Sequence, residues 1–118
     1  MDNQAVQQAI MRCCDEFVMP RFRSLEAGDI EEKGPGDLVT VADRECELAL
    51  TEALRDIVDV TVVGEEATAD NAALLASVGS DAAWIVDPID GTSNFAAGRE
   101  SFAVMVAFAE RGITTHAC

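Results

Sequence analysis

The sequence has 118 residues, which fits one small domain, and 49% of them are hydrophobic, so a core is possible. The formal net charge of −14 disfavours binding to the phosphate backbone of nucleic acids, and no apolar run approaches the roughly 18 residues of a membrane span. No secretory signal is evident, and the four cysteines lack metal-ligand spacing. We therefore expect a cytoplasmic protein without nucleic-acid or membrane partners.

The first half of the chain is predicted to hold two helices and a loop. Apolar residues at helical spacing predict a helix over residues 4–25, with a kink or break at Pro20. The polar segment 28–37 contains three glycines and a proline and is typical of a loop. A short extended stretch follows, and Asp43 is expected to cap a second helix that ends near Ile57.

The second half reads mainly as strands. Residues 58–63 are mostly β-branched and predict a buried strand before Gly64, and a helix is expected over residues 70–78. Further strands are expected at 84–86 and 102–108 and from Ile113 onward. The last strand would leave an apolar edge unpaired, so we expect a mixed α/β chain that stops inside a sheet.

Carboxylates gather at tight turns, and two of these turns follow predicted strands. Glu65 comes after the strand that ends at Val63, and Asp87 comes after the strand that ends at Val86. Because α/β enzymes often place ligands at the carboxyl ends of strands, these side chains are candidates for a binding site.

The segment from Asp87 to Gly91 is the most informative turn. Pro88 disfavours helix at Asp87, and Gly91 permits a sharp reversal, so Asp87 and Asp90 can point at one place. Two close carboxylates repel one another unless a cation lies between them, and Mg²⁺ is the natural occupant. The carbonyl of Ile89 can add an oxygen, and three backbone amides can bind an anion, namely those of Gly91, Thr92 and Ser93. An ordinary capped Asp-Pro turn would also explain a bare Asp-Pro-x-Asp pattern.

The longer string WIVDPIDGTSNF resembles the signature of the inositol monophosphatase family, a group of lithium-sensitive, magnesium-dependent phosphatases. The Gly-Glu-Glu of residues 64–66 and the DLVTVAD of residues 37–43 are similar to other family segments, as is the strand at 102–108. The resemblance extends from about Lys33 to the end of the sequence.

This resemblance implies roles for individual residues. Metal ligands would be Glu65, Asp87, the carbonyl of Ile89, and Asp90. Thr92 and Glu65 would position the attacking water, while Asp43 and Thr40 would orient the site and Lys33 would help to place an ion or a water. The phosphate would be held by the backbone at Gly91, Thr92 and Ser93.

The resemblance also implies that residues 1–118 form the N-terminal metal- and phosphate-binding part of a layered α/β fold. A downstream WDxAAG-like motif, whose aspartate completes the second metal site in the family, does not occur in the sequence. We therefore expect an incomplete sheet and a fragment whose full-length relative would be a homodimer.

The implied reaction is hydrolysis of a small phosphate monoester by metal-activated water, with inositol monophosphate as the favoured substrate. Alternative substrates are a nucleotide 3′-phosphate, histidinol phosphate and fructose bisphosphate. A non-catalytic protein that binds metal or another molecule is the remaining alternative. Residues 93–95, Ser-Asn-Phe, favour the inositol branch.

Overall fold

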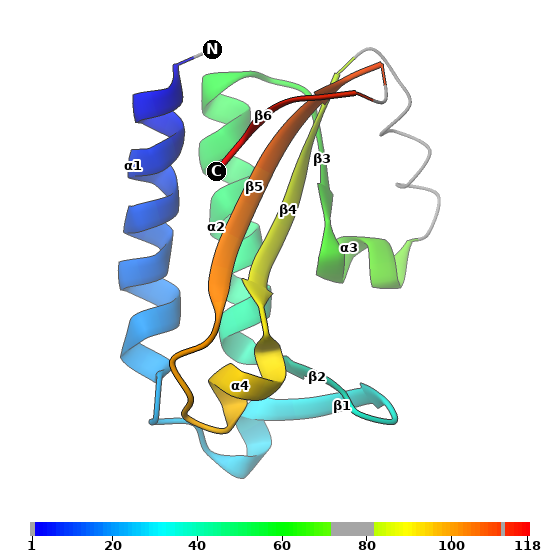
Figure 1. Cartoon of the computed structure of the whole chain (residues 1–118). Helices are drawn as coiled ribbons and strands as arrows, with labels where there is room; N and C mark the ends of the chain where they lie inside the picture. Colours follow the sequence, from blue (N-terminus) through cyan, green and yellow to red (C-terminus); the bar gives the residue numbers. More distant parts are fainter. Residues whose placement is uncertain (1, 72–81, 112) are drawn as a thin grey trace.

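The computed structural model describes residues 2–71, 82–111 and 113–118. Helices alternate irregularly with strands along the chain (Figure 1). The regular elements are α1 (Asn3–Cys13), β1 (Ile30–Gly34), β2 (Asp37–Thr40), α2 (Val41–Ile57), β3 (Thr61–Gly64), α3 (Glu65–Asp70), β4 (Ala83–Asp90), α4 (Thr92–Ala96), β5 (Ala103–Glu110) and β6 (Ile113–Ala117).

The main sheet has four strands in the order β3-β4-β5-β6, and β1 pairs with β2 in a separate antiparallel hairpin. The β3–β4 pair is parallel, and the other two pairs are antiparallel. Helices α1 and α2 lie side by side on one face of this sheet, while α4 and the hairpin lie together near one end of it (Figure 1). The observed architecture is the mixed α/β class that the sequence predicts.

The hydrophobic core lies between the sheet and the two long helices. Alternate residues of β4 and β5 face the helices, because side chains on a strand point to opposite sides. Trp84 and Phe108 meet edge to face with ring centroids 4.8 Å apart, and the indole nitrogen of Trp84 donates to the carbonyl of Val58 at 3.0 Å. Leu50 and Leu54 of α2 are completely buried against this layer.

The first predicted helix is shorter than expected. Helix α1 ends at Cys13 and continues as a π-helical turn (Cys14–Val18) and a 3₁₀ turn (Met19–Arg21) that contains Pro20. The predicted break at Pro20 coincides with the change from π-helical to 3₁₀ geometry, but the α-helix itself ends seven residues earlier, at Cys13.

Three predictions for the middle of the chain were wrong in detail. Segment 28–37 is not simply a loop, because it contains β1 and the turn into β2. Thr40, and not Asp43, is the N-cap of α2, and Asp43 is the third helical residue of a capping box. The strand after Val58 begins only at Thr61.

The segment Asp87–Asp90 belongs to β4 and is not a free turn. Its pairing with β5 is irregular between Asp87 and Asp90, and the buried Pro88 lies within this irregularity. A proline has no amide hydrogen to donate and is tolerated in a paired strand at such a bulge.

The helix predicted over residues 70–78 falls on positions of which 72–78 lie outside the described residues. Helix α3, which the sequence did not predict, follows β3 directly. Within the described part of the chain, no helix combines the length and the apolar character needed to cross a membrane.

Candidate metal and phosphate site

The pairing of β3 with β4 brings two of the predicted metal ligands together. Gly64 is the register partner of Val86 in the parallel pair. Glu65 directly follows Gly64 as the first residue of α3, and Asp87 directly follows Val86 within β4, so the two residues lie at the same end of this strand pair. Asp90 lies farther along β4, is exposed, and is near enough for its charge to act on Asp87.

The electrostatics of this pair are those of two carboxyl groups that compete for one proton. Partial burial and the adjacent Asp87 raise the pKa of Glu65 to about 8, although the residue as a whole is exposed. The pKa of Asp87 is also raised, mainly by burial and further by Asp90 and Asp43, while the interaction with Glu65 lowers it. A cation at this point would remove the repulsion.

One oxygen of Asp87 is available to a metal ion. Its Oδ1 atom is buried and has no hydrogen-bond partner among the described residues. A buried carboxylate oxygen without a partner is costly, and a metal ion is one way to satisfy it. The described residues contain no group of three or more His, Cys, Asp and Glu side chains that could hold a metal ion. Two carboxylates with water and substrate phosphate nevertheless suit Mg²⁺.

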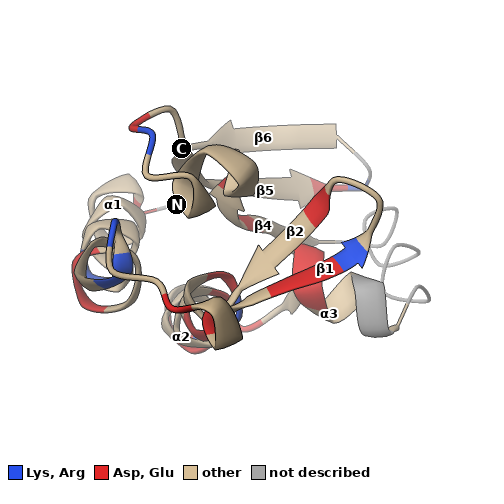
Figure 2. Ribbon diagram, turned by 90° about the horizontal axis from the view of Figure 1, so that it is seen from below, with Lys and Arg blue, Asp and Glu red and all other residues tan. Residues whose placement is uncertain are grey.

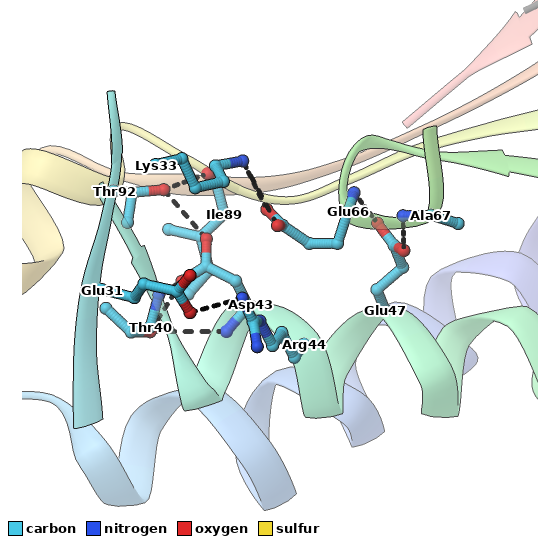
Figure 3. Close-up of polar contacts among 10 residues, drawn as sticks. All are labelled: Glu31, Lys33, Thr40, Asp43, Arg44, Glu47, Glu66, Ala67, Ile89 and Thr92. Carbon is cyan, nitrogen blue, oxygen red and sulfur yellow. Dashed lines mark hydrogen bonds and ion pairs between the residues drawn. The ribbon is translucent and has the colours of Figure 1, made fainter. Parts of the chain in front are cut away.

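Asp43 joins the start of α2 to the start of α4 (Figure 3). It is completely buried. Its Oδ2 accepts from the Thr40 amide at 2.8 Å and from the Thr40 hydroxyl at 2.6 Å. Its Oδ1 accepts from the Thr92 hydroxyl at 2.9 Å, and that hydroxyl also lies 3.0 Å from the Ile89 carbonyl oxygen. The structure thus brings four predicted residues into one network.

Gly91 makes the turn between β4 and α4. Its φ of 86° lies in the left-handed region, and a Cβ atom there would be 2.8 Å from the carbonyl oxygen of Ser101. The amides that follow, including those of Thr92 and Ser93, open a short helix and have no acceptor within it. They start two residues after Asp90, so a phosphate bound there would lie next to the carboxylates.

Lys33 of β1 binds Glu66. Its Nζ is 3.3 Å and 3.4 Å from the two carboxylate oxygens of Glu66. Burial lowers the pKa of Lys33, but Glu66, Asp37 and Glu65 outweigh this effect and raise it. Figure 2 shows this basic position in β1 beside the acidic start of α3. Lys33 is thus held near Glu65 as a permanent cation.

Sequence reasoning missed Glu47, a buried residue of α2. Its two carboxylate oxygens accept from the backbone amides of Glu66 and Ala67, each at 2.8 Å. The available signal was its position four residues after Asp43, which places both acids on the same face of the helix.

Known proteins resemble this chain both in sequence and in fold. The sequence model of the "Inositol monophosphatase family" matches residues 2–118. The chain is 40% identical over 85 residues to "Phosphatase IMPL1, chloroplastic" of Arabidopsis thaliana, covering 71% of this chain and 22% of that protein. It is 37% identical to "Nus factor SuhB" of Pseudomonas aeruginosa, covering 90% of this chain and 38% of that protein.

A third relative is "Fructose-1,6-bisphosphatase/inositol-1-monophosphatase" of Aquifex aeolicus, 37% identical over 77% of this chain and 33% of that protein. Among solved structures, an IMPase of Thermotoga maritima superimposes with a TM-score of 0.75 at 25% identity, covering 99% of this chain and 43% of that one. The chain therefore spans well under half the length of these relatives. The match over residues 2–118, together with the shared fold, shows that the chain belongs to the inositol monophosphatase family.

Proposed function

We propose that this chain supplies the magnesium- and phosphate-binding part of an enzyme that hydrolyses a small phosphate monoester, with inositol monophosphate as the favoured substrate. The observation that carries the proposal is the Glu65–Asp87 pair, with its raised pKa values and the unpartnered Oδ1 of Asp87. Perturbed carboxyl groups at the end of a sheet are typical of functional sites.

Two ions would share these ligands: Glu65, Asp87 and the carbonyl oxygen of Ile89 would hold one, and Asp87 and Asp90 would hold a second. Bound Mg²⁺ would lower the pKa of a water molecule, neutralise phosphate oxygens and stabilise the leaving alkoxide. The chain's own contribution is to position the reactants, because Asp87 lies on β4, Glu65 directly follows β3, and the register of these two strands fixes the separation of the two residues.

The remaining residues orient the site and the phosphate. Asp43 accepts the Thr92 hydroxyl hydrogen bond and thereby fixes the start of α4, where the backbone amides of Gly91, Thr92 and Ser93 would face the phosphate. With its proton directed to Asp43 or to Ile89, the Thr92 oxygen keeps its lone pairs for a water molecule. Lys33 would add positive charge near Glu65.

The substrate is proposed from the signature and from the relatives. Residues 93–95 favour the inositol branch, and the bisphosphatase name of the Aquifex relative makes fructose bisphosphate the first alternative. The four cysteines are free thiols in the structure, which supports a reducing cytoplasmic location. A homodimer and inhibition by lithium belong to the same proposal.

A second candidate function is magnesium binding without turnover. It is favoured by the lack of a third converging carboxylate among the described residues. A second metal ion held by two carboxylates would bind weakly, because Mg²⁺ demands nearly ideal octahedral geometry.

The test is phosphate release from inositol 1-phosphate by the purified chain, with and without Mg²⁺, beside fructose 1,6-bisphosphate. Asp87→Asn should abolish release, and Asp56→Asn, the same change at an exposed position of α2, should not. Turnover that persists without Mg²⁺ or in Asp87→Asn would refute the proposal. Magnesium binding without any release would favour the second candidate.

A further inference from the structure

The turn between β3 and α3 is held by hydrogen bonds to a side chain of α2. The buried Glu47 side chain spans this turn, and its two oxygens accept from the successive amides of Glu66 and Ala67 at 2.8 Å each (Figure 3). These amides belong to the first turn of α3, where a helix has no acceptors of its own. A side chain distant in sequence therefore caps this helix.

Gly64 leaves the room that this cap needs. A Cβ atom on Gly64 would lie 2.6 Å and 2.7 Å from the two carboxylate oxygens of Glu47. The φ of Gly64 is −98°, an angle that any residue adopts, so its backbone conformation does not demand glycine. The space that the Glu47 carboxylate occupies explains the glycine before Glu65.

The Glu47 cap contacts the residues on both sides of Glu65 in the sequence. Gly64 packs against the Glu47 carboxylate, and Glu66 and Ala67 donate to it. Glu65 lies between these contacts and directs its own carboxyl group to Asp87. A buried carboxylate with two amide donors is satisfied only in one orientation, so it fixes the backbone on which Glu65 stands.

We propose that Glu47 is a positioning residue for the metal site: its carboxylate fixes the turn at Gly64–Ala67 and thereby holds Glu65 against Asp87. The proposal rests on the function proposed above for Glu65 and Asp87. Glu47 does not itself reach the metal in this role. Residues that orient ligands in this way typically change metal affinity by about 10- to 100-fold when they are replaced.

The experiment compares Glu47→Gln with Glu52→Gln in the complete chain. Both changes remove one negative charge from α2, but Glu52 is exposed. In Glu47→Gln the amide NH₂ faces a backbone N–H, so one hydrogen bond is lost at nearly constant side-chain volume. Hydrogen exchange of individual amides by NMR measures how well the Glu47 cap protects the Glu66 and Ala67 amides. Calorimetric titration with Mg²⁺ alone measures the affinity of the metal site.

We expect the Glu66 and Ala67 amides to exchange roughly tenfold faster in Glu47→Gln than in Glu52→Gln, with core amides of β5 unchanged. The Kd for Mg²⁺ should rise about tenfold. Unchanged exchange at both amides would show that the Glu47 cap does not fix this turn. Faster exchange with unchanged magnesium affinity would overturn the positioning role and leave a purely structural one.

A second pair of variants separates positioning from a general loss of stability. Gly64→Ala should weaken magnesium binding when Glu47 is present, and much less when Glu47 is alanine, because the clash is then gone. Equal effects in the two backgrounds would contradict the proposal. Ile57→Val, which alters packing on the same helix, should leave magnesium affinity unchanged. If the wild-type chain binds no Mg²⁺, the proposed function is wrong, while amide exchange still decides whether the Glu47 cap forms.

Discussion

Replacing Asp43 by alanine should destabilise the chain more than any other single change in the polar network around the site. The buried carboxylate accepts three hydrogen bonds, two from Thr40 and one from Thr92. Hydrogen bonds to a charged group contribute about 1.5 kcal/mol each at the lower end of the usual range. Because bonds in one network are not additive, we expect a loss of about 3 kcal/mol in the free energy of unfolding.

Asp43→Asn should cost only about 1 kcal/mol, and the geometry gives the reason. The asparagine oxygen can still accept from Thr40, which leaves its NH₂ group facing Thr92. The Thr92 hydroxyl can then donate to the Ile89 carbonyl oxygen, already 3.0 Å away, and accept from the new NH₂ group. Rotation of the Thr92 hydroxyl therefore keeps most of the hydrogen bonds, and the loss in the free energy of unfolding stays small.

Urea unfolding followed by the fluorescence of Trp84 measures both variants. Trp84 is the only tryptophan and is 1% exposed, so its emission reports the core. Asp56→Asn, at an exposed position on the same helix, is the control and should change the free energy by less than about 0.5 kcal/mol. Equal losses for the alanine and asparagine variants of Asp43, or an alanine variant within about 1 kcal/mol of wild type, would refute the reasoning.

Three further predictions concern the same region. Without metal, thermal stability should fall as the pH rises from about 4.5 to about 8, because the native state keeps a proton on Glu65 that the unfolded state has released. A thermal-shift assay would contradict this if the melting temperature did not change with pH. Added Mg²⁺ should reduce this dependence on pH. Gly91→Ala should cost about 1–3 kcal/mol in urea unfolding, since its φ is positive and Ser101 leaves no room, whereas Gly28→Ala, with open space around it, should cost much less. Lys33→Gln should raise the pKa of Glu66, because the ion pair lowers it, and NMR titration of that carboxyl group would show no change if the pair did not form in solution.

The sequence predicted those parts of the site that local patterns encode. β-Branched residues before Glu65 and a buried run before Asp87 indicated two strands, and their parallel pairing does place both carboxyl groups at one edge. Helix α2 was also predicted, with an error at its start. The Thr40-x-x-Asp43 spacing is that of a capping box, so the correct N-cap was readable from the sequence.

The parts that could not be predicted depend on contacts between distant segments. Strand β1 has a mainly polar, partly exposed sequence without apolar alternation, and it is a strand because it pairs with β2. Helix α3 has six residues, too few for a periodic pattern, and its first amides are capped by Glu47 from another helix. Pairing and capping across the fold leave no periodic signal in the segment that they stabilise.

The register of two parallel strands has a consequence for how the site can change. Because Gly64 pairs with Val86, the separation of Glu65 and Asp87 is counted in residues along β3 and β4. A single deletion inside either strand would displace one carboxyl group by about 3.3 Å, roughly the span between two ligands of one ion, and would turn alternate side chains to the other face. The spacing of the two acids can therefore change only in whole-residue steps, and each step also exchanges core and surface residues. Substitution of the acids themselves leaves that spacing intact, so the metal preference of the site can be altered far more readily than its geometry.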